Sequence, residues 1–263
     1  MRILFCVDTN KNLGHLGKRL SKVLNLFNEE LYYVDVFHVY KKPSANAPHM
    51  PTTMVDIQKD EEKLMMKFLS DCQHLISDVL EKKLKKASIV NSHLVQGNFM
   101  KKFKDHIKFH KYELIVLLPG QKDPLQLLLM GRHITKLVSK IGIPMLILPK
   151  DEVFSKRKTQ FIGMLEKPKK QRKQFRKNKV IRQIKDEAMR YIHICKHGDA
   201  VYEQVDVLNH KNRISAFEEF HATRTENHIY ILNHKPEKGF AKWKKSSFTK
   251  AILAKNDSSI LVI

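Results

Sequence analysis

Short apolar runs alternate with stretches of helical periodicity along the first half of this 263-residue chain, and this alternation constrains the fold most. A short run rich in β-branched residues predicts a strand, whereas apolar residues three and four apart predict one helix face. The expected strands are 3–7, 31–40, 88–96, 114–118 and 145–148, and the apolar series of the intervening helices begin at Leu13, Leu64, Phe99 and Ile134. Because strands separated by helical crossovers run parallel, we expect an α/β fold with a doubly wound parallel sheet.

The end of this pattern returns 115 residues later in the chain. The shift needs no gap and aligns residues 114–117 with 229–232, 137–138 with 252–253, and 146–148 with 261–263. Such an internal repeat predicts two related domains, which we assign to 1–150 and 151–263. We also expect their final strands, Met145–Leu148 and Ser259–Val262, to pack together, since an uncovered edge strand invites unwanted pairing.

The second domain is expected to be a trimmed copy of the first. Its first three expected strands are 161–165, 191–195 and 202–208. Only six residues separate the last two, which is too short for a parallel crossover. Either these segments pair as a hairpin or one of them is not a strand, and in both cases the copy lacks a helix.

Basic residues dominate the charge of the chain. Lysine and arginine outnumber aspartate and glutamate by 49 to 27, which gives a formal net charge of +22. The segment 167–185 holds ten basic residues and no acidic one. Such a run is typical either of a surface that attracts phosphates or of a solvated helix face, and both interpretations stay open. Phe175 and Val180 are five residues apart, a poor fit to one helical stripe, so we expect an irregular stretch over 167–172 before a regular helix.

We expect a cytoplasmic protein with no membrane partner. The three cysteines are too few and too scattered for a disulfide framework, and no CxxC spacing suggests a zinc site. The apolar run at residues 3–7 is much shorter than the apolar core of a signal peptide. No stretch approaches the roughly 20 apolar residues that a membrane-spanning helix needs.

Several segments resemble the universal stress protein family in its tandem form. They are MRILFCVDTN at the start, VDVFHVY from residue 34, HLVQGNF from residue 93, YELIVLLPG from residue 112 and GRHITKLVSKIGIPMLILPK from residue 131. The resemblance covers residues 1–150, and in the second half mainly 216–263. It implies two five-stranded parallel sheets of order 3-2-1-4-5. It also implies that the halves pair as an internal version of the family's homodimer, and leaves a further homodimer open.

Members of that family that bind ATP carry a loop of the form G-x2-G-x9-G-S/T, whose backbone N–H groups wrap phosphates. Glycines permit positive φ and a close backbone approach, and the following helix N-terminus attracts anions. Here Leu118 and Gln121 stand where the first two glycines belong. Gly131 is kept, but Arg132 replaces the small hydroxyl residue. The resemblance therefore points to a degenerate loop.

The residues left for a nucleotide or anion pocket in the first domain are Asp8, Val39, Gly120, Gly131, Arg132 and His133. In one interpretation they form an anion site at the strand ends, where open α/β sheets bind ligands, and arginine charge replaces the lost amides. In the other, Asp8 caps a helix and Gly131 eases a packing contact. The expected cofactor is accordingly none, or ATP or AMP.

Other chemistry has little support in the sequence. His106 and His110 lie four apart on one helix face, but zinc needs three or four ligands, and no cysteine or acidic residue has a ligand-like spacing nearby. Motifs of hydrolases and nucleotidyl transferases are missing. We therefore expect a non-enzymatic stress-response binding or regulatory protein with a degenerate nucleotide site. Two alternatives stay open: an ATP- or AMP-binding switch with slow hydrolysis, and weak, non-specific nucleic-acid binding through 167–185.

Overall fold

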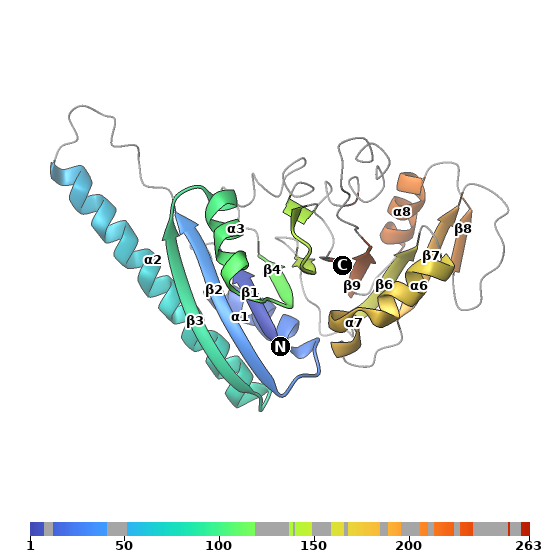
Figure 1. Cartoon of the computed structure of the whole chain (residues 1–263), viewed down its shortest axis with the longest axis horizontal. Helices are drawn as coiled ribbons and strands as arrows, with labels where there is room; N and C mark the ends of the chain where they lie inside the picture. The colour runs from blue at the N-terminus through green and yellow to red at the C-terminus, as the bar shows by residue number, and fades with distance from the viewer. Residues whose placement is uncertain are drawn as a thin grey trace. The chain divides into compact units, whose positions relative to one another are not determined.

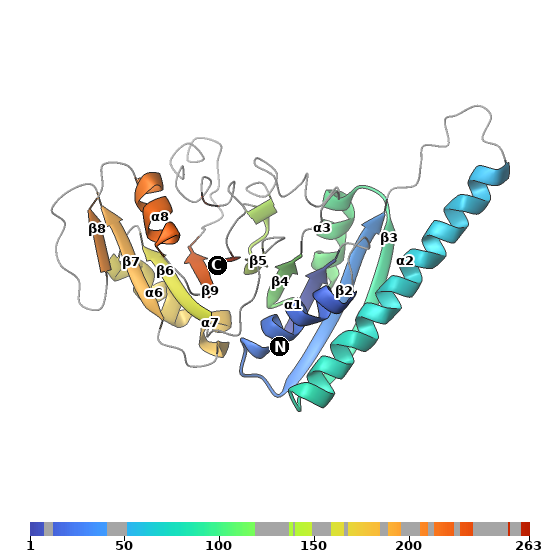
Figure 2. The ribbon, with the colours of Figure 1, turned by 180° about the vertical axis from the view of Figure 1, so that it is seen from behind.

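The computed structural model describes residues 1–7, 13–40, 52–118, 137–138, 140–148, 159–165, 168–184, 189–195, 206–209, 213–223, 227–233, 252 and 259–263. The chain divides into two compact units, Met1–Leu125 and Gln126–Ile263. Figures 1 and 2 show the ribbon from two opposite sides. Among the described residues, no helix is long and apolar enough to cross a membrane.

The first unit alternates strands and helices in the expected order. Its elements are β1 (Arg2–Cys6), α1 (Leu13–Asn25), β2 (Leu31–Tyr40), α2 (Thr52–Asp78), the π-helical turn η1 (Val79–Lys83), β3 (Ala87–Gln96), α3 (Phe99–Phe109) and β4 (Leu114–Leu117). The strands lie in the order β3-β2-β1-β4, and all three pairings are parallel. Doubly wound α/β architecture is therefore confirmed for this unit.

Helices cover both faces of this sheet. α1 and α2 pack together on one face, with α2 against β3, and α3 lies on the opposite face against β2 (Figures 1 and 2). Ile3, Leu4 and Phe5 of β1 are fully buried, because a strand covered on both sides needs apolar side chains pointing both ways. α2 begins at Thr52, twelve residues before Leu64, where the apolar periodicity starts.

The second unit repeats this topology. Its elements are β5 (Met145–Ile147), β6 (Thr159–Leu165), α6 (Pro168–Lys177), α7 (Lys179–Gln183), β7 (Arg190–Cys195), β8 (Asp206–Asn209), α8 (Arg213–Ala222), β9 (Asn227–Leu232) and β10 (Ser259–Val262). The strand order β8-β7-β6-β9-β10 is parallel throughout and corresponds to 3-2-1-4-5 of the repeat. The expected strand order is confirmed for this copy.

The two final strands pair as expected. β5 and β10 are antiparallel, with Ile260 opposite Ile147 and Val262 opposite Met145. Both strands are buried throughout. The pairing gives hydrogen-bond partners to the backbone N–H and C=O groups along one edge of each strand. Without it, these groups could pair with a strand of another chain.

Both expected alternatives for the second and third strands of the second unit, a hairpin or a segment that is not a strand, are wrong. β7 and β8 pair in parallel, with Ile192 opposite Asp206 and Cys195 opposite Asn209. β8 begins at Asp206, four residues later than the apolar run at Tyr202 suggested, so the connection is longer than the sequence pattern implied. The connecting residues 196–205, where a helix was expected to be missing, lie outside the described residues.

The expected irregular stretch at 167–172 is also wrong, because α6 starts at Pro168. Proline suits a first helical turn, where its missing N–H has no partner to lose. The break comes later, at Asn178, whose extended backbone starts a second helix and whose Oδ1 accepts hydrogen bonds from the N–H groups of Val180 and Ile181. This interruption lets both Phe175 and Val180 face the core, at 0% and 1% exposure.

Candidate functional site

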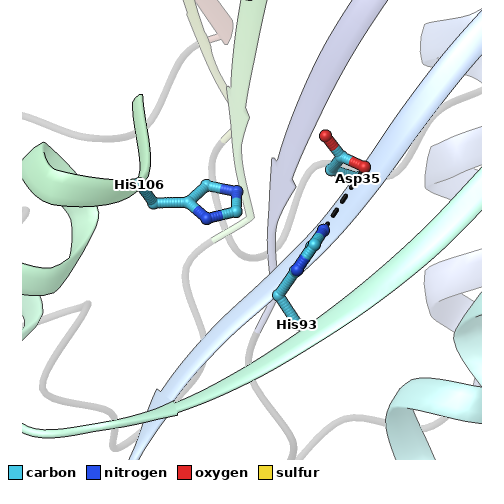
Figure 3. A group of neighbouring side chains, drawn as sticks. All are labelled: Asp35, His93 and His106. Atoms are coloured by element: carbon cyan, nitrogen blue, oxygen red, sulfur yellow. Dashed lines mark ion pairs between the residues drawn. The ribbon is translucent and has the colours of Figure 1, made fainter. Parts of the chain in front are cut away.

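A cluster of polar and titratable side chains lies between the first unit's sheet and α3. Asp35 sits in the middle of β2, on the same sheet face as Phe37, since alternate residues of a strand share a face. The parallel register places Asn91 beside Asp35 and His93 beside Phe37, so β3 contributes to the same face. His106 reaches the cluster from α3, and its imidazole points toward Asp35 and His93 (Figure 3).

Asp35 is the centre of this cluster. Its side chain is 3% exposed, and a buried carboxylate requires compensation by donors or cations. Oδ2 accepts hydrogen bonds from the Tyr112 hydroxyl at 2.5 Å and from Arg2 Nη2 at 3.3 Å. Oδ1 accepts one from Asn91 Nδ2 at 3.1 Å, and His93 Nε2 lies 3.4 Å from the same oxygen. Three other segments of the chain, around Arg2, Asn91 and Tyr112, thus converge on one carboxylate.

Three imidazoles gather next to this carboxylate. The ring of His106 lies 4.7 Å from that of His93 and 4.8 Å from that of His110, measured between centroids. His106 Nε2 is 2.8 Å from the Tyr112 hydroxyl. Because that hydroxyl donates its hydrogen to Asp35, Nε2 is the donor in this contact and carries the hydrogen of the neutral ring. His110 Nδ1 accepts a hydrogen bond from Arg2 Nη2 at 3.1 Å.

The environment shifts the pKa values of three of these groups. Burial works against ionisation of Asp35, but hydrogen bonds from Tyr112 and Asn91, together with the adjacent His93 imidazole, outweigh it and hold the carboxyl pKa well below its usual value. Burial and repulsion by the neighbouring His93 and His110 lower the pKa of His106 to about 4. Burial and the bond to Asp35 raise the pKa of Tyr112. At neutral pH the cluster therefore holds an ionised carboxylate beside a neutral His106.

The pocket that the sequence suggested falls mostly outside the described residues. Asp8, Gly120, Gly131, Arg132 and His133 are all in that part of the chain. Val39 is described: it lies half-buried near the carboxyl end of β2, beside Val95 of β3. It is four residues beyond Asp35 along the strand, which is roughly 13 Å in an extended chain. Val39 and Asp35 are therefore separate places along β2.

The first position of the phosphate loop is well described. Leu118, which stands where ATP-binding relatives carry glycine, is fully buried. Its N–H donates a hydrogen bond to the carbonyl oxygen of Cys6 at 3.1 Å, which continues the pairing of β4 with β1. Neither its backbone N–H nor its side chain is therefore free to surround a phosphate.

A histidine fixes the end of the first strand in each repeat. In the first unit His38 of β2 is buried and its Nδ1 lies 2.9 Å from the carbonyl oxygen of Val7, directly after β1. In the second unit His193 of β7 is buried and its Nδ1 lies 2.7 Å from the carbonyl oxygen of Leu165, at the end of β6. In both units a histidine of the second strand meets the end of the first strand, so the repeat extends to side-chain detail.

The sequence pattern found only part of the Asp35 cluster. It placed His106 and His110 on one helix face but saw no further ligand, because Asp35 and His93 are 71 and 13 residues before His106. The one available signal was the charged Asp35 within the otherwise apolar run of β2. A charge within a buried strand indicates a partner across the sheet, although it does not identify that partner.

Comparisons with solved structures agree with the topology. The chain superimposes on a universal stress protein from Archaeoglobus fulgidus with a TM-score of 0.61 and 12% identity, over 99% of this chain and 95% of that one. A putative universal stress protein from Pseudomonas aeruginosa superimposes with a TM-score of 0.58 and 10% identity, over 100% of this chain and 92% of that one. A functionally unknown protein from the same species gives the same values. No family model and no curated protein matches the sequence. The chain therefore has the fold of the universal stress proteins.

Proposed function

We propose that this chain is a non-enzymatic binding and regulatory protein of the stress response, and that the nucleotide site of its first domain is degenerate. The fold of universal stress proteins, found over nearly the whole chain, supports the first part of this proposal. The observation that carries the second part is Leu118, which is buried and whose N–H is bonded to Cys6. An intramolecular pseudo-dimer of the two repeats, in a cytoplasmic protein, belongs to the same proposal.

The loss of the first loop position weakens phosphate binding for a geometric reason. A phosphate-binding loop works by directing several unpaired N–H groups at the anion, and glycine lets the backbone approach closely. At Leu118 the N–H is already bonded, and a side chain replaces the open space. Arg132 could supply charge in return, yet a charge on a long side chain does not restore the fixed geometry of the amides.

Nucleotide titration tests this proposal. A ligand present at 100 times its dissociation constant adds about 2.7 kcal/mol to stability, which shifts a melting temperature by several degrees. We expect millimolar ATP or AMP, with Mg²⁺, to produce a much smaller shift. Asp8→Ala and Gly131→Val should then melt with the same small nucleotide shift as the unchanged chain. A large shift that both variants abolish would contradict the proposal and support the nucleotide-binding switch instead.

A second candidate function is weak, sequence-independent polyanion binding. It is favoured by the α6 basic face, which we define as the exposed residues Lys170, Lys173, Arg176 and Lys177. Their positive charges project from a helix that is anchored to the sheet by the fully buried Phe175. A fixed array of exposed cations attracts phosphate backbones through counterion release, without reading a sequence.

A further inference from the structure

We propose that Asp35, His93 and His106 form a binding site for a divalent transition metal ion such as Zn²⁺. One potential ligand atom from each side chain lies within 4.8 Å of the other two. The three residues come from β2, β3 and α3, and their side chains point toward one another in Figure 3. This site shares no residue with the expected nucleotide pocket, and the inference does not depend on the proposed function.

The donor set determines the class of metal. Two imidazole nitrogens and one carboxylate oxygen suit zinc and its neighbours in the first transition row, whereas magnesium and calcium prefer ligand sets made entirely of oxygen. Three protein ligands leave room for a water molecule as the fourth, which is the arrangement of an open zinc site. The site therefore fits a reversibly bound ion better than a fully enclosed structural one.

The carboxylate is already held in a suitable orientation. Tyr112 and Arg2 both donate to Oδ2, while Oδ1 faces His93 and, among the described residues, receives only Asn91 as a hydrogen-bond donor. An ionised oxygen accepts more than one contact, so Oδ1 retains capacity for a cation. Ligating carboxylates are commonly fixed by such outer hydrogen bonds. Arg2 is the main electrostatic opponent of a metal ion, but its side chain is 36% exposed, so solvent screens its charge.

His93 gives independent support for a ligand. Its Nε2 is a buried atom that lies 3.4 Å from Asp35 Oδ1 and makes no hydrogen bond to the part of the chain that the structure describes. Buried polar atoms are nearly always paired, so an unpaired one directed into a polar cluster calls for an explanation. A metal ion between His93 and Asp35 would satisfy this nitrogen. The His93 side chain as a whole is 31% exposed, which gives a metal ion a route from solvent.

Metal binding requires a small rearrangement. In a tetrahedral site with bonds of about 2.0–2.1 Å, ligand atoms lie roughly 3.4 Å apart. Asp35 Oδ1 and His93 Nε2 already have this spacing, so only the His106 imidazole must approach them slightly. If His106 binds through Nε2, that nitrogen must give up the hydrogen that it donates to Tyr112. Nδ1 then carries the ring hydrogen, and no net proton is released from the neutral imidazole. Tyr112 keeps its bond to Asp35 Oδ2.

The experiment is a competition titration of the full chain with Zn²⁺ against a chromophoric chelator. The chain has 14 histidines, so weak background binding is expected and matched variants are essential. We compare His93→Gln and His106→Gln with His74→Gln, which removes an exposed imidazole from α2. Each cluster variant should weaken the tightest site at least tenfold, while His74→Gln should bind Zn²⁺ as the unchanged chain does.

Spectroscopy locates the site and separates binding from folding. Co²⁺ added to the unchanged chain should give the visible absorption bands of a four- or five-coordinate ion, and both cluster variants should lose these bands. Far-UV circular dichroism of the metal-free variants confirms that they are folded. Equal Zn²⁺ affinity in all four proteins, or no binding tighter than that of the exposed histidines, would overturn the proposal. Nucleotide binding is measured separately and affects neither result.

Discussion

Asp35→Ala tests whether the buried cluster stabilises the first unit in the absence of metal. The substitution removes the acceptor of Tyr112, Arg2 and Asn91 at once. The three lost hydrogen bonds do not cost the same free energy. Tyr112 is 6% exposed, whereas Arg2 and Asn91 both reach solvent and can bond to water instead. The loss should therefore come mainly from the Tyr112 hydroxyl, which loses its charged acceptor and keeps only the neutral His106 Nε2 at 2.8 Å as a neighbour.

The expected magnitude follows from these contacts. A hydrogen bond to a charged group contributes about 1.5–3 kcal/mol, and this is the main loss because the neutral His106 replaces the carboxylate as the neighbour of Tyr112. Arg2 can turn its guanidinium to water, so its contribution stays below about 1 kcal/mol. Together these terms predict a destabilisation of about 3 kcal/mol. Asp78→Ala is the matched control, because Asp78 at the end of α2 is 58% exposed and pairs with Lys82 of η1; we expect a loss below about 0.5 kcal/mol.

The assay is urea unfolding followed by far-UV circular dichroism, with a chelator present and the two units fitted as separate transitions. Tyr112→Phe removes only the hydroxyl and should cost about 2 kcal/mol. Combined with Asp35→Ala it should add little, because both changes remove the same hydrogen bond. Fully additive losses, or a loss for Asp35→Ala no larger than that for Asp78→Ala, would refute the reasoning.

Three further predictions concern other parts of the chain. Gly163→Ala should destabilise the second unit by about 1–3 kcal/mol in thermal unfolding, because a Cβ at Gly163 would lie 2.8 Å from Cδ1 of Tyr191 on β7 and 3.0 Å from Cε2 of Phe175 on α6; an unchanged melting temperature would contradict this packing of Tyr191 and Phe175 against β6. Burial raises the pKa of the Cys72 thiol to about 12 and also raises that of Cys6, so at pH 8 both stay protonated. A thiol reagent should then label no more than one of the three cysteines before denaturant is added. Labelling of two thiols would contradict the burial of Cys6 and Cys72. Replacing the α6 basic face with glutamine should flatten the salt dependence of duplex DNA binding, whose slope is about −0.9 per phosphate neutralised; an unchanged slope would assign that binding to charge elsewhere.

The fold was predictable wherever one periodicity determined the structure. The apolar run around Phe5 and the helical series through Leu16 and Leu20 each depend on local spacing, and these residues are fully buried. The strand order came from the family resemblance. The irregular stretch was expected at 167–172, but the helix is interrupted at Asn178. The five-residue spacing between Phe175 and Val180 indicates an interruption without showing where it lies. A capping asparagine was the missing signal.

The Asp35 cluster was not predictable in the same way. Its members are brought together by strand register and by the packing of α3 on β2, both of which are tertiary features. Sequence spacing could place His106 and His110 together only because a helix repeats every 3.6 residues. Asp35 and His93 lie on different strands, and no local pattern links their positions. The loop position at Leu118, by contrast, was visible from the sequence, since the resemblance specified a glycine there.

The nucleotide content of the purified protein tests the central proposal most directly. The chain is isolated under native conditions without added nucleotide, extracted with acid, and the extract is separated by ion-pairing chromatography. If Leu118 and Gln121 have removed the phosphate-binding geometry, the extract should contain only traces of ATP, ADP or AMP per chain. A content near one adenine nucleotide per chain, lost in Asp8→Ala, would contradict the degenerate site and make this protein a nucleotide-binding switch.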